Sequence, residues 1–165
     1  MRTVRPAAPP AGMRRLLFRL PVYVYRVGLG AVLGRRFLYL VHTGRVSGRR
    51  RDVVIETVGR EGGRYQVCSG FGTSAQWYRN IRHNPDVAIQ VGRHRARATA
   101  VLLDTARGAD LMARYASRHP TLARRLCTVM GFEVDGSEAD FREVGRRVPF
   151  VEFVPQPREH RIDNR

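Results

Sequence analysis

The chain contains no lysine, so all 30 of its basic residues are arginine, while only 14 residues are acidic. The formal net charge is +16 at pH 7. A field of this strength draws polyanions, which makes nucleic acid, anionic lipid and multiply charged small molecules the partner classes to consider. The predicted strands carry no alternating aromatic side chains on which bases could stack, so nucleic acid is the least favoured of these partners.

Cysteine and metal-binding motifs are scarce. The two cysteines, Cys68 and Cys127, are far apart in sequence, and there is no CxxC or HExxH motif. Cys68 falls in an apolar, strand-like run and Cys127 in a helical pattern, which predicts two buried thiols in a reducing cytoplasm. The five histidines are scattered along the chain, so no metal site is expected.

Long apolar runs are also absent. The most apolar stretch, residues 16–33, is interrupted by Arg19, Pro21 and Arg26. Its uninterrupted part is shorter than the about 20 residues that a membrane-spanning helix needs. We therefore expect an amphipathic helix over residues 13–34. Two interpretations remain open: the helix packs on a sheet, or it contacts anionic lipid peripherally at the inner face of the plasma membrane.

The 165 residues, of which 43% are hydrophobic, predict one domain with a real core. Residues 1–12, rich in proline and alanine, should be a disordered tail, residues 13–155 the domain, and residues 156–165 a polar tail. Strands are predicted at 36–43, 52–58, 64–69, 86–91, 95–104 and 148–154. Helices are predicted at 75–82, 106–117, 121–130 and 138–144, with Ser74 and Ser137 as N-caps. Short antiparallel strands without βαβ alternation favour an α+β fold or a small barrel with flanking helices.

A basic loop separates the first two predicted strands. Its glycines allow a tight turn and a close approach to a ligand, and hydroxyls and guanidiniums alternate with them. This combination is typical of an anion site, and of a phosphate site in particular. The alternative is a solvated hairpin tip, which would not require the hydroxyls and glycines. The candidate ligands of the anion are Thr43, Gly44, Arg45, Ser47, Gly48, Arg49 and Arg51.

A second glycine-rich loop, residues 69–74, follows the third predicted strand. Its backbone N–H groups would face an anion or a polar ring edge at the start of the next helix. Phe71 is difficult to explain as a core residue in such a loop and would suit the cover of a flat ligand. The helical spacing of Trp77, Tyr78 and Ile81 predicts that these three side chains belong to the core.

No catalytic residue can be assigned from the sequence. Ser47 and Ser74 do not lie in GxSxG motifs. Glu56 falls among apolar residues in a predicted strand, where it is either paired with an arginine at the edge of the core or catalytic. Without acid–base machinery, we expect a cofactor that carries its own chemistry.

Four motifs, TGRVSG (43–48), SGFG (69–72), WYRNIRHNPDVAIQVG (77–92) and VDGSEADFREVGRRVPFVEFVP (134–155), together resemble the deazaflavin-dependent oxidoreductase family, also called the deazaflavin-dependent nitroreductase family. The resemblance covers residues 13–155. It implies a split β-barrel like that of the FMN-binding pyridoxamine phosphate oxidases. It also implies coenzyme F-420, a deazaflavin with a phosphate and an oligoglutamate tail. A relative that uses FMN is the alternative.

The resemblance further implies hydride transfer from reduced F-420 to an electron-poor acceptor such as a quinone, an enone or a nitro compound. A barrel that binds a cofactor or lipid without catalysis is the alternative. Of the candidates, those in the basic loop match the family's tail-binding residues. The ring-side residues would be Ser69, Gly70, Phe71 and Gly72, supported by Trp77 and Asn80.

This chain departs from the family at the ring-side loop, where better-known members carry a lysine that is missing here. The cationic contact is therefore lost or supplied elsewhere, with Arg79 and Arg82 as candidates. The substrate-pocket tyrosines of the family cannot be mapped onto this sequence, and Tyr23 and Tyr25 are the only candidates. The sequence does not indicate the oligomeric state.

Overall fold

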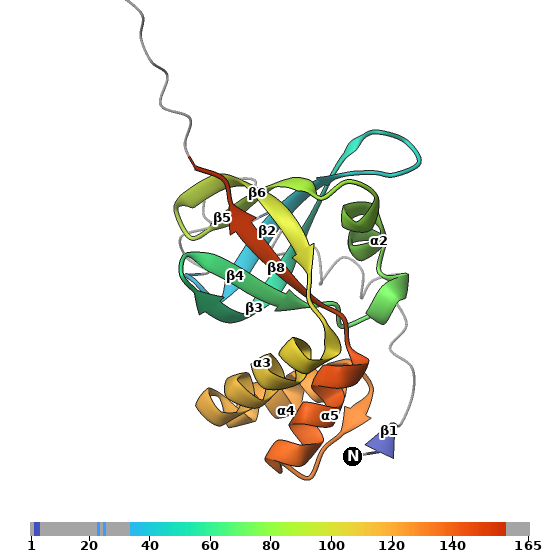
Figure 1. Cartoon of the computed structure of the whole chain (residues 1–165), viewed down its shortest axis with the longest axis vertical. Helices are drawn as coiled ribbons and strands as arrows, with labels where there is room; N and C mark the ends of the chain where they lie inside the picture. The colour runs from blue at the N-terminus through green and yellow to red at the C-terminus, as the bar shows by residue number, and fades with distance from the viewer. Residues whose placement is uncertain (1, 4–22, 24, 26–33, 158–165) are drawn as a thin grey trace, which may run out of the picture.

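The computed structural model describes residues 2–3, 23, 25 and 34–157 (Figure 1). Most of the predicted disordered tail, of the predicted amphipathic helix over residues 13–34 and of the polar C-terminal tail therefore lies outside the described residues. From the N-terminal part, Tyr23 and Tyr25 are described as helical.

Six strands form a closed barrel in the order β2-β3-β4-β8-β6-β5 (Figure 1). Every neighbouring pair is antiparallel. The fold is thus the predicted split β-barrel with flanking helices. The strands are β2 (Phe37–Thr43), β3 (Arg50–Glu61), β4 (Arg64–Cys68), β5 (Asp86–Val91), β6 (His94–Leu102) and β8 (Phe150–Pro155).

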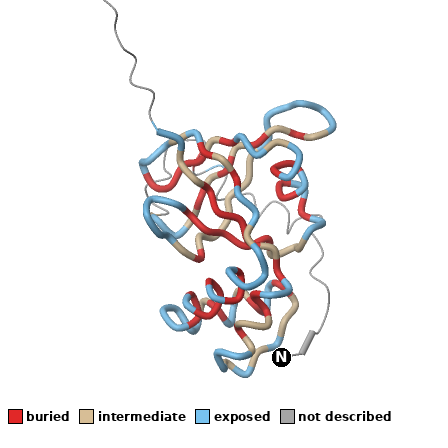
Figure 2. Tube along the Cα trace, in the orientation of Figure 1, coloured by how far each residue is buried: buried red, intermediate tan, exposed pale blue. Residues whose placement is uncertain are grey.

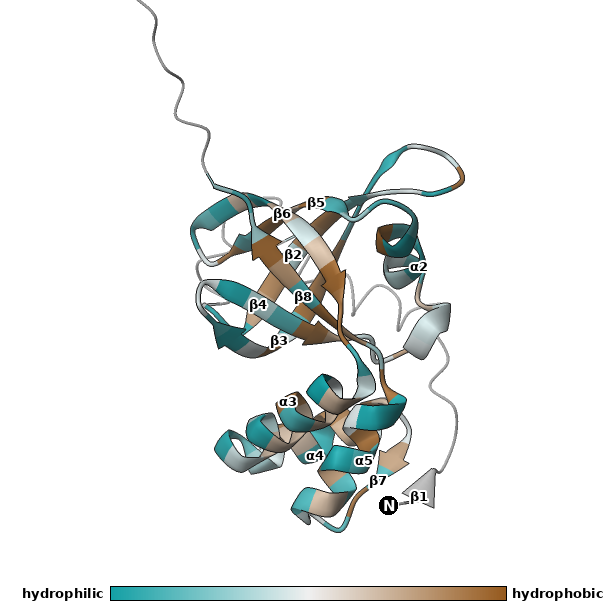
Figure 3. Cartoon of the chain, in the orientation of Figure 1, coloured by the Kyte–Doolittle hydropathy of each residue, from teal (hydrophilic) through white to brown (hydrophobic). Residues whose placement is uncertain are grey.

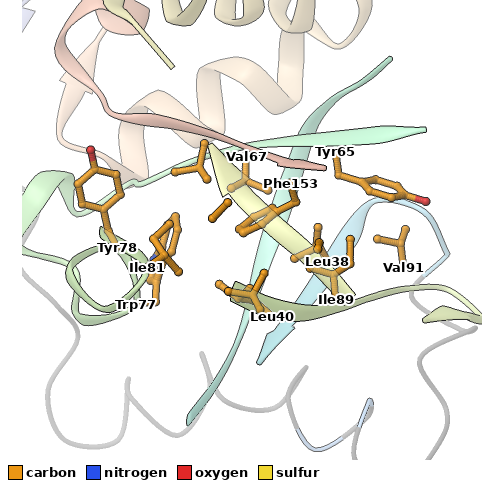
Figure 4. Close-up of a cluster of buried hydrophobic side chains, with 14 of the residues drawn as sticks. Leu38, Leu40, Tyr65, Val67, Trp77, Tyr78, Ile81, Ile89, Val91 and Phe153 are labelled. Atoms are coloured by element: carbon orange, nitrogen blue, oxygen red, sulfur yellow. The ribbon is translucent and has the colours of Figure 1, made fainter. Parts of the chain in front are cut away.

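The alternation of side chains along each strand fills the barrel. On β2, Leu38 and Leu40 are fully buried and Tyr39 between them is not, as expected where one face of a strand meets a core. The short helix α2 (Gln76–His83) adds Trp77, Tyr78 and Ile81 to the same cluster, which confirms their predicted core position (Figure 4).

A layer of three helices, α3 (Thr105–Arg118), α4 (Pro120–Val129) and α5 (Glu138–Arg147), lies below the barrel in Figure 1. These helices enclose a second core, and their inward sides are buried (Figure 2). Polar residues lie on the outward sides of α3 and α5 (Figure 3). Helices α3 and α5 cross closely at Gly108 and Gly145, where a Cβ on Gly108 would lie 2.6 Å from the Gly145 carbonyl oxygen.

Two cap predictions have different outcomes. Ser137 is the N-cap of α5, because its Oγ accepts a hydrogen bond from the Asp140 N–H at 3.2 Å. Ser74 does not cap α2. It belongs to a 3-10 turn, Gly72–Ser74, and its hydroxyl donates to the Phe71 carbonyl at 2.7 Å, so α2 begins after Ala75 without a side-chain cap.

One small sheet was not predicted. Strand β1 (Arg2–Thr3) pairs with β7 (Phe132–Glu133). The first of these strands falls inside the segment that was predicted to be disordered. Two-residue strands are too short to show a periodicity, so only the contact between distant parts of the chain reveals them.

The barrel is split beside the first half of β3. This strand pairs with β2 from Arg50 to Glu56, whereas its pairing with β4 begins at Thr57. The Thr57 N–H donates toward β2, to the Arg36 carbonyl. Because backbone groups alternate between the two edges of an antiparallel strand, Asp52, Val54 and Glu56 turn their N–H and C=O groups to the open edge.

Candidate functional site

A groove of about 1020 Å³ lies at this split. It is bounded by the open edge of β3, the β2–β3 loop, the turn at Gly70–Phe71, α2 and α4. The structure therefore brings the two predicted ligand-binding loops to one site. The predicted residues that line it are Gly44, Arg45, Ser47, Arg51, Gly70, Phe71, Trp77 and Asn80.

Asn80 connects the basic loop to α2. Its Oδ1 accepts the Arg45 backbone N–H at 3.2 Å and the Arg45 Nη1 at 3.0 Å. The same Nη1 donates to Gln76 Oε1 at 2.9 Å, one helical turn before Asn80. The guanidinium is thereby held at the wall of the groove by neutral acceptors, and no carboxylate among the described residues pairs with its positive charge.

His42, on β2, contacts Asn80 on its other side-chain atom. Its Nδ1 lies 3.2 Å from Asn80 Nδ2, and the imidazole is buried. Burial lowers the pKa of His42, and the Arg51 charge acts in the same direction, against the opposing effects of the Thr43 backbone and Asp52. A neutral imidazole accepts the Asn80 amide proton at Nδ1. Sequence reasoning missed His42, although it directly precedes the loop motif.

The ring-side turn is built differently from the prediction. Ser69 is fully buried, its hydroxyl donates to the Gly72 carbonyl at 2.6 Å, and its N–H donates to the Pro149 carbonyl. Gly72 has φ of 61°, which favours glycine. Ser69 and Gly72 therefore shape the turn and do not line the groove, whereas Gly70 and the half-buried Phe71 do.

Three other predicted residues, Thr43, Gly48 and Arg49, do not line the groove. The Gly48 N–H donates to the Gly44 carbonyl, and Ser47 Oγ accepts the Arg49 N–H at 3.3 Å. Arg49 is exposed. The loop thus keeps its shape through its own backbone, and Arg45 and Arg51 are the arginines that it presents to the groove.

The remaining candidates lie elsewhere. Tyr25 lines a different cavity, on the outer face of β2, and the half-exposed Tyr23 is not at the groove either. The structure therefore does not place either tyrosine in the groove. Arg79 and Arg82 are exposed on α2 and do not line the groove, so neither replaces the family's lysine.

The inner end of the groove was not predicted as a site. Helix α4 provides an apolar wall, and its members are Leu122, Leu126, Val129 and the adjacent Met130. Opposite them, Glu56 Oε1 accepts the Tyr115 hydroxyl at 2.6 Å and forms an ion pair with Arg36 Nη2 at 3.1 Å. The predicted pairing of Glu56 with an arginine is thus confirmed. Burial and the bond to Glu56 raise the pKa of Tyr115.

The donor set of the groove fits a long ligand with an anionic tail and a flat head. The guanidiniums of Arg45 and Arg51 lie at the end formed by the basic loop, and the apolar wall of α4 lies at the other end, together with Arg36 and Arg125. Within the described part of the chain, His, Cys, Asp and Glu form no cluster that could hold a metal. Over the same residues, no helix is both long and apolar enough to cross a membrane. Cys68 and Cys127 are free and buried, as predicted.

Solved structures with this fold share low sequence identity with the chain. An F420-H2 dependent reductase (FDR-A) is 23% identical, with a TM-score of 0.51 over 73% of this chain and 95% of that chain. The conserved hypothetical protein Rv2991 from Mycobacterium tuberculosis is 12% identical, with a TM-score of 0.54 over 79% and 80%. The heme storage protein HutZ from Vibrio cholerae is 15% identical, with a TM-score of 0.52 over 81% and 89%. No curated protein matches the sequence.

The family described as F420H(2)-dependent quinone reductase matches residues 17–129, which span the basic loop, the glycine-rich turn, α2 and α4. The cofactor is accordingly coenzyme F-420, in agreement with the basic loop and the apolar wall of the groove. The chain belongs to the F420H(2)-dependent quinone reductase family of oxidoreductases.

Proposed function

We propose that the protein transfers a hydride from reduced F-420 to an electron-poor acceptor, with quinones as the first candidates and enones and nitro compounds as the alternatives. One observation carries this proposal: a single groove connects the arginines of the basic loop with a chamber that has an apolar wall from α4. When bound, the coenzyme supplies the hydride. The protein then has to orient the two reactants and keep water away from them.

The charged tail would be held by the basic loop. Arg51 and Arg45 reach the groove from this loop, and Arg45 is already fixed in place by Asn80 and Gln76. A preorganised guanidinium loses little side-chain entropy when it binds a phosphate or a carboxylate. The exposed Arg49 would add long-range attraction without a fixed contact.

The deazaflavin ring would lie between Phe71 and the open edge of β3. The backbone groups of Val54 and Glu56 at this edge lack a strand partner among the described residues. Such groups suit the amide-like edge of a flat heterocycle, because a strand edge presents alternating donors and acceptors. Ser69 is excluded from this role by its burial and its bond to Gly72.

The acceptor would occupy the chamber under α4. Its wall of Leu122, Leu126 and Val129 suits an apolar ring and excludes water from the transfer. Arg36 and Arg125 also line the groove at this end and would donate to a developing oxyanion. Solvent at the open mouth supplies the proton, so the reaction requires no dedicated acid.

Titration tests the assignment. Reduced F-420 and FMN are added to the purified protein and binding is followed by fluorescence. Wild type should bind reduced F-420, and Arg51→Ala should bind it roughly 10 to 100 times more weakly, the equivalent of a hydrogen bond to a charged group. Arg118→Ala, on the exposed end of α3, is the matched control and should bind normally. Binding of neither compound by wild type would refute the proposal.

Catalysis is tested separately by mixing the bound, reduced coenzyme with menadione or a nitroarene and following its oxidation. Oxidation by menadione supports the quinone assignment, and oxidation by the nitroarene alone supports the nitroreductase alternative. Tight binding without oxidation by any acceptor would leave the non-catalytic cofactor-binding barrel as the function.

We also propose that the protein is cytoplasmic and that residues 13–34 contact anionic lipid at the inner face of the plasma membrane. The arginines of this segment, with its apolar residues, support the proposal. Co-sedimentation of the full chain with phosphatidylserine-containing vesicles should exceed that with neutral vesicles. Replacement of Arg14 and Arg19 by glutamate should abolish the difference, and an unchanged difference would remove this segment from the interaction.

A further inference from the structure

A second cavity, of about 530 Å³, lies on the outer face of β2, β5 and β6. It shares no described lining residue with the groove. The assigned function of the groove therefore leaves it unexplained. Three arginines, Arg50, Arg95 and Arg97, line it, and no described acidic residue does.

The strand register explains the hollow. Val41 pairs with Ala88 and Ala88 with Arg97, while Tyr39 pairs with Gln90 and Gln90 with Arg95. Neighbouring strands lie about 4.8 Å apart, so the backbones of Arg95 and Arg97 on β6 are two strands, about 10 Å, from β2. The small side chain of Ala88 leaves space between them.

The walls of the cavity are fixed by specific contacts. Tyr25 stacks on Tyr39 with ring centroids 5.3 Å apart and an interplanar angle of 11°. The Tyr25 hydroxyl donates to the Phe37 carbonyl at 2.7 Å. The Tyr39 hydroxyl donates to Asp52 Oδ2 at 2.8 Å. Asp52 lies on the same face of β3 as Arg50, although it is not among the residues that line this cavity. The cavity is thus held open by ordered aromatic side chains.

One arginine of the cavity is also held in place by hydrogen bonds. Arg95 Nε donates to Gln90 Oε1 at 2.9 Å, and the buried Gln90 is itself anchored to the Gly92 carbonyl. Among the described residues, Arg50 and Arg97 have no ion-pair partner. Unpaired guanidiniums around a concave surface attract a ligand with several carboxylates or phosphates.

The two cavities meet at β3. Arg50 and Arg51 are consecutive strand residues, so their side chains point to opposite faces. Arg51 lines the groove, and Arg50 lines the second cavity. An anionic chain that leaves the groove at Arg51 therefore meets the next cation on the other side of the β2–β3 hairpin. Crossing a single hairpin needs only a few linked residues, since each extended residue spans about 3.3–3.6 Å.

We propose that the second cavity binds the terminal carboxylates of the oligoglutamate tail of F-420, after the tail has crossed the β2–β3 hairpin. This inference rests on the proposed function, because it takes the coenzyme to lie in the groove. Arg95 and Arg97 would then raise the affinity only for forms of the coenzyme with a long tail, whereas Arg51 and Arg45 would raise it for every form.

The test compares reduced F-420 with a long tail and the same coenzyme without glutamates. Wild type should bind the long form at least about tenfold more tightly, the effect of one hydrogen bond to a charged group. Arg97→Gln, and Arg95→Gln combined with it, should lose this advantage and bind the tail-less form as wild type does. Arg118→Gln on α3 should behave like wild type. The advantage should shrink at high salt.

Several results would overturn the inference. One is an equal affinity of wild type for the two forms, and another is an unchanged long-tail advantage in the doubly substituted protein. A third is binding of ATP at Arg97 to protein already saturated with the long-tailed coenzyme, which would assign the cavity to a separate polyanion. Failure of both forms to bind would instead refute the proposed function of the groove.

Discussion

Replacement of Asn80 by alanine should destabilise the fold and loosen the basic loop. The buried carboxamide joins β2, the loop and α2 through its contacts with His42 and Arg45. Without it, the buried His42 Nδ1 loses its partner, which costs about 1–3 kcal/mol, while Arg45 can turn to water and loses only about 0.5–1.5 kcal/mol. The expected loss is therefore about 1.5–4.5 kcal/mol.

Urea unfolding followed by circular dichroism measures this loss as a lower midpoint at an unchanged slope. A double-mutant cycle separates its parts. Arg45→Ala alone should be mild, and the effects of Arg45→Ala and Asn80→Ala should not add, because the two residues share hydrogen bonds. Additive effects, or an Asn80→Ala protein within about 0.5 kcal/mol of wild type, would show that the carboxamide does not hold the loop.

Three further predictions concern other parts of the molecule. Because burial lowers the pKa of His42, the unfolded chain takes up its proton first as the pH falls through about 6.5. The free energy of unfolding should thus fall below that pH until the folded imidazole is also protonated, and urea midpoints from pH 8 to 5 should show less of this fall in His42→Gln. Burial raises the pKa of both Cys68 and Cys127 to about 12, so a thiol reagent at pH 8 should label neither in native protein and both in urea; rapid native labelling would contradict their burial. Gly108→Ala and Gly145→Ala should each cost about 1–3 kcal/mol, measured by thermal unfolding, because the added Cβ would lie 2.6 and 2.5 Å from the facing carbonyl oxygen; stabilisation, as expected from helix propensity alone, would contradict this crossing.

The sequence predicts those parts of the fold that depend on short-range patterns. The short apolar run around Leu38 and Leu40 predicts β2, and Ser137 marks the start of α5. The basic loop is predictable because its glycines, hydroxyls and arginines are adjacent. Its structure nevertheless differs in one important respect. The second strand begins at Arg50 and not at residue 52, so the run of arginines divides between two faces.

The parts that were missed depend on contacts between distant residues. Tyr115 and Glu56 are 59 positions apart, and no local pattern pairs them. The α4 wall of the groove follows from how α4 packs against the split, which helical periodicity alone does not show. Ser69 lies in a loop whose composition is typical of a ligand site, but its hydroxyl donates to the Gly72 carbonyl within its own turn.

The split beside β3 also has a consequence for the exchange of amide protons with solvent. The N–H groups of Val53 and Ile55 face β2 and should exchange slowly, whereas those of Val54 and Glu56 face the opening and should exchange fast. A strand inside a closed barrel would thus show protection that alternates from residue to residue. A ligand seated against that edge would slow the fast set and leave the slow set unchanged.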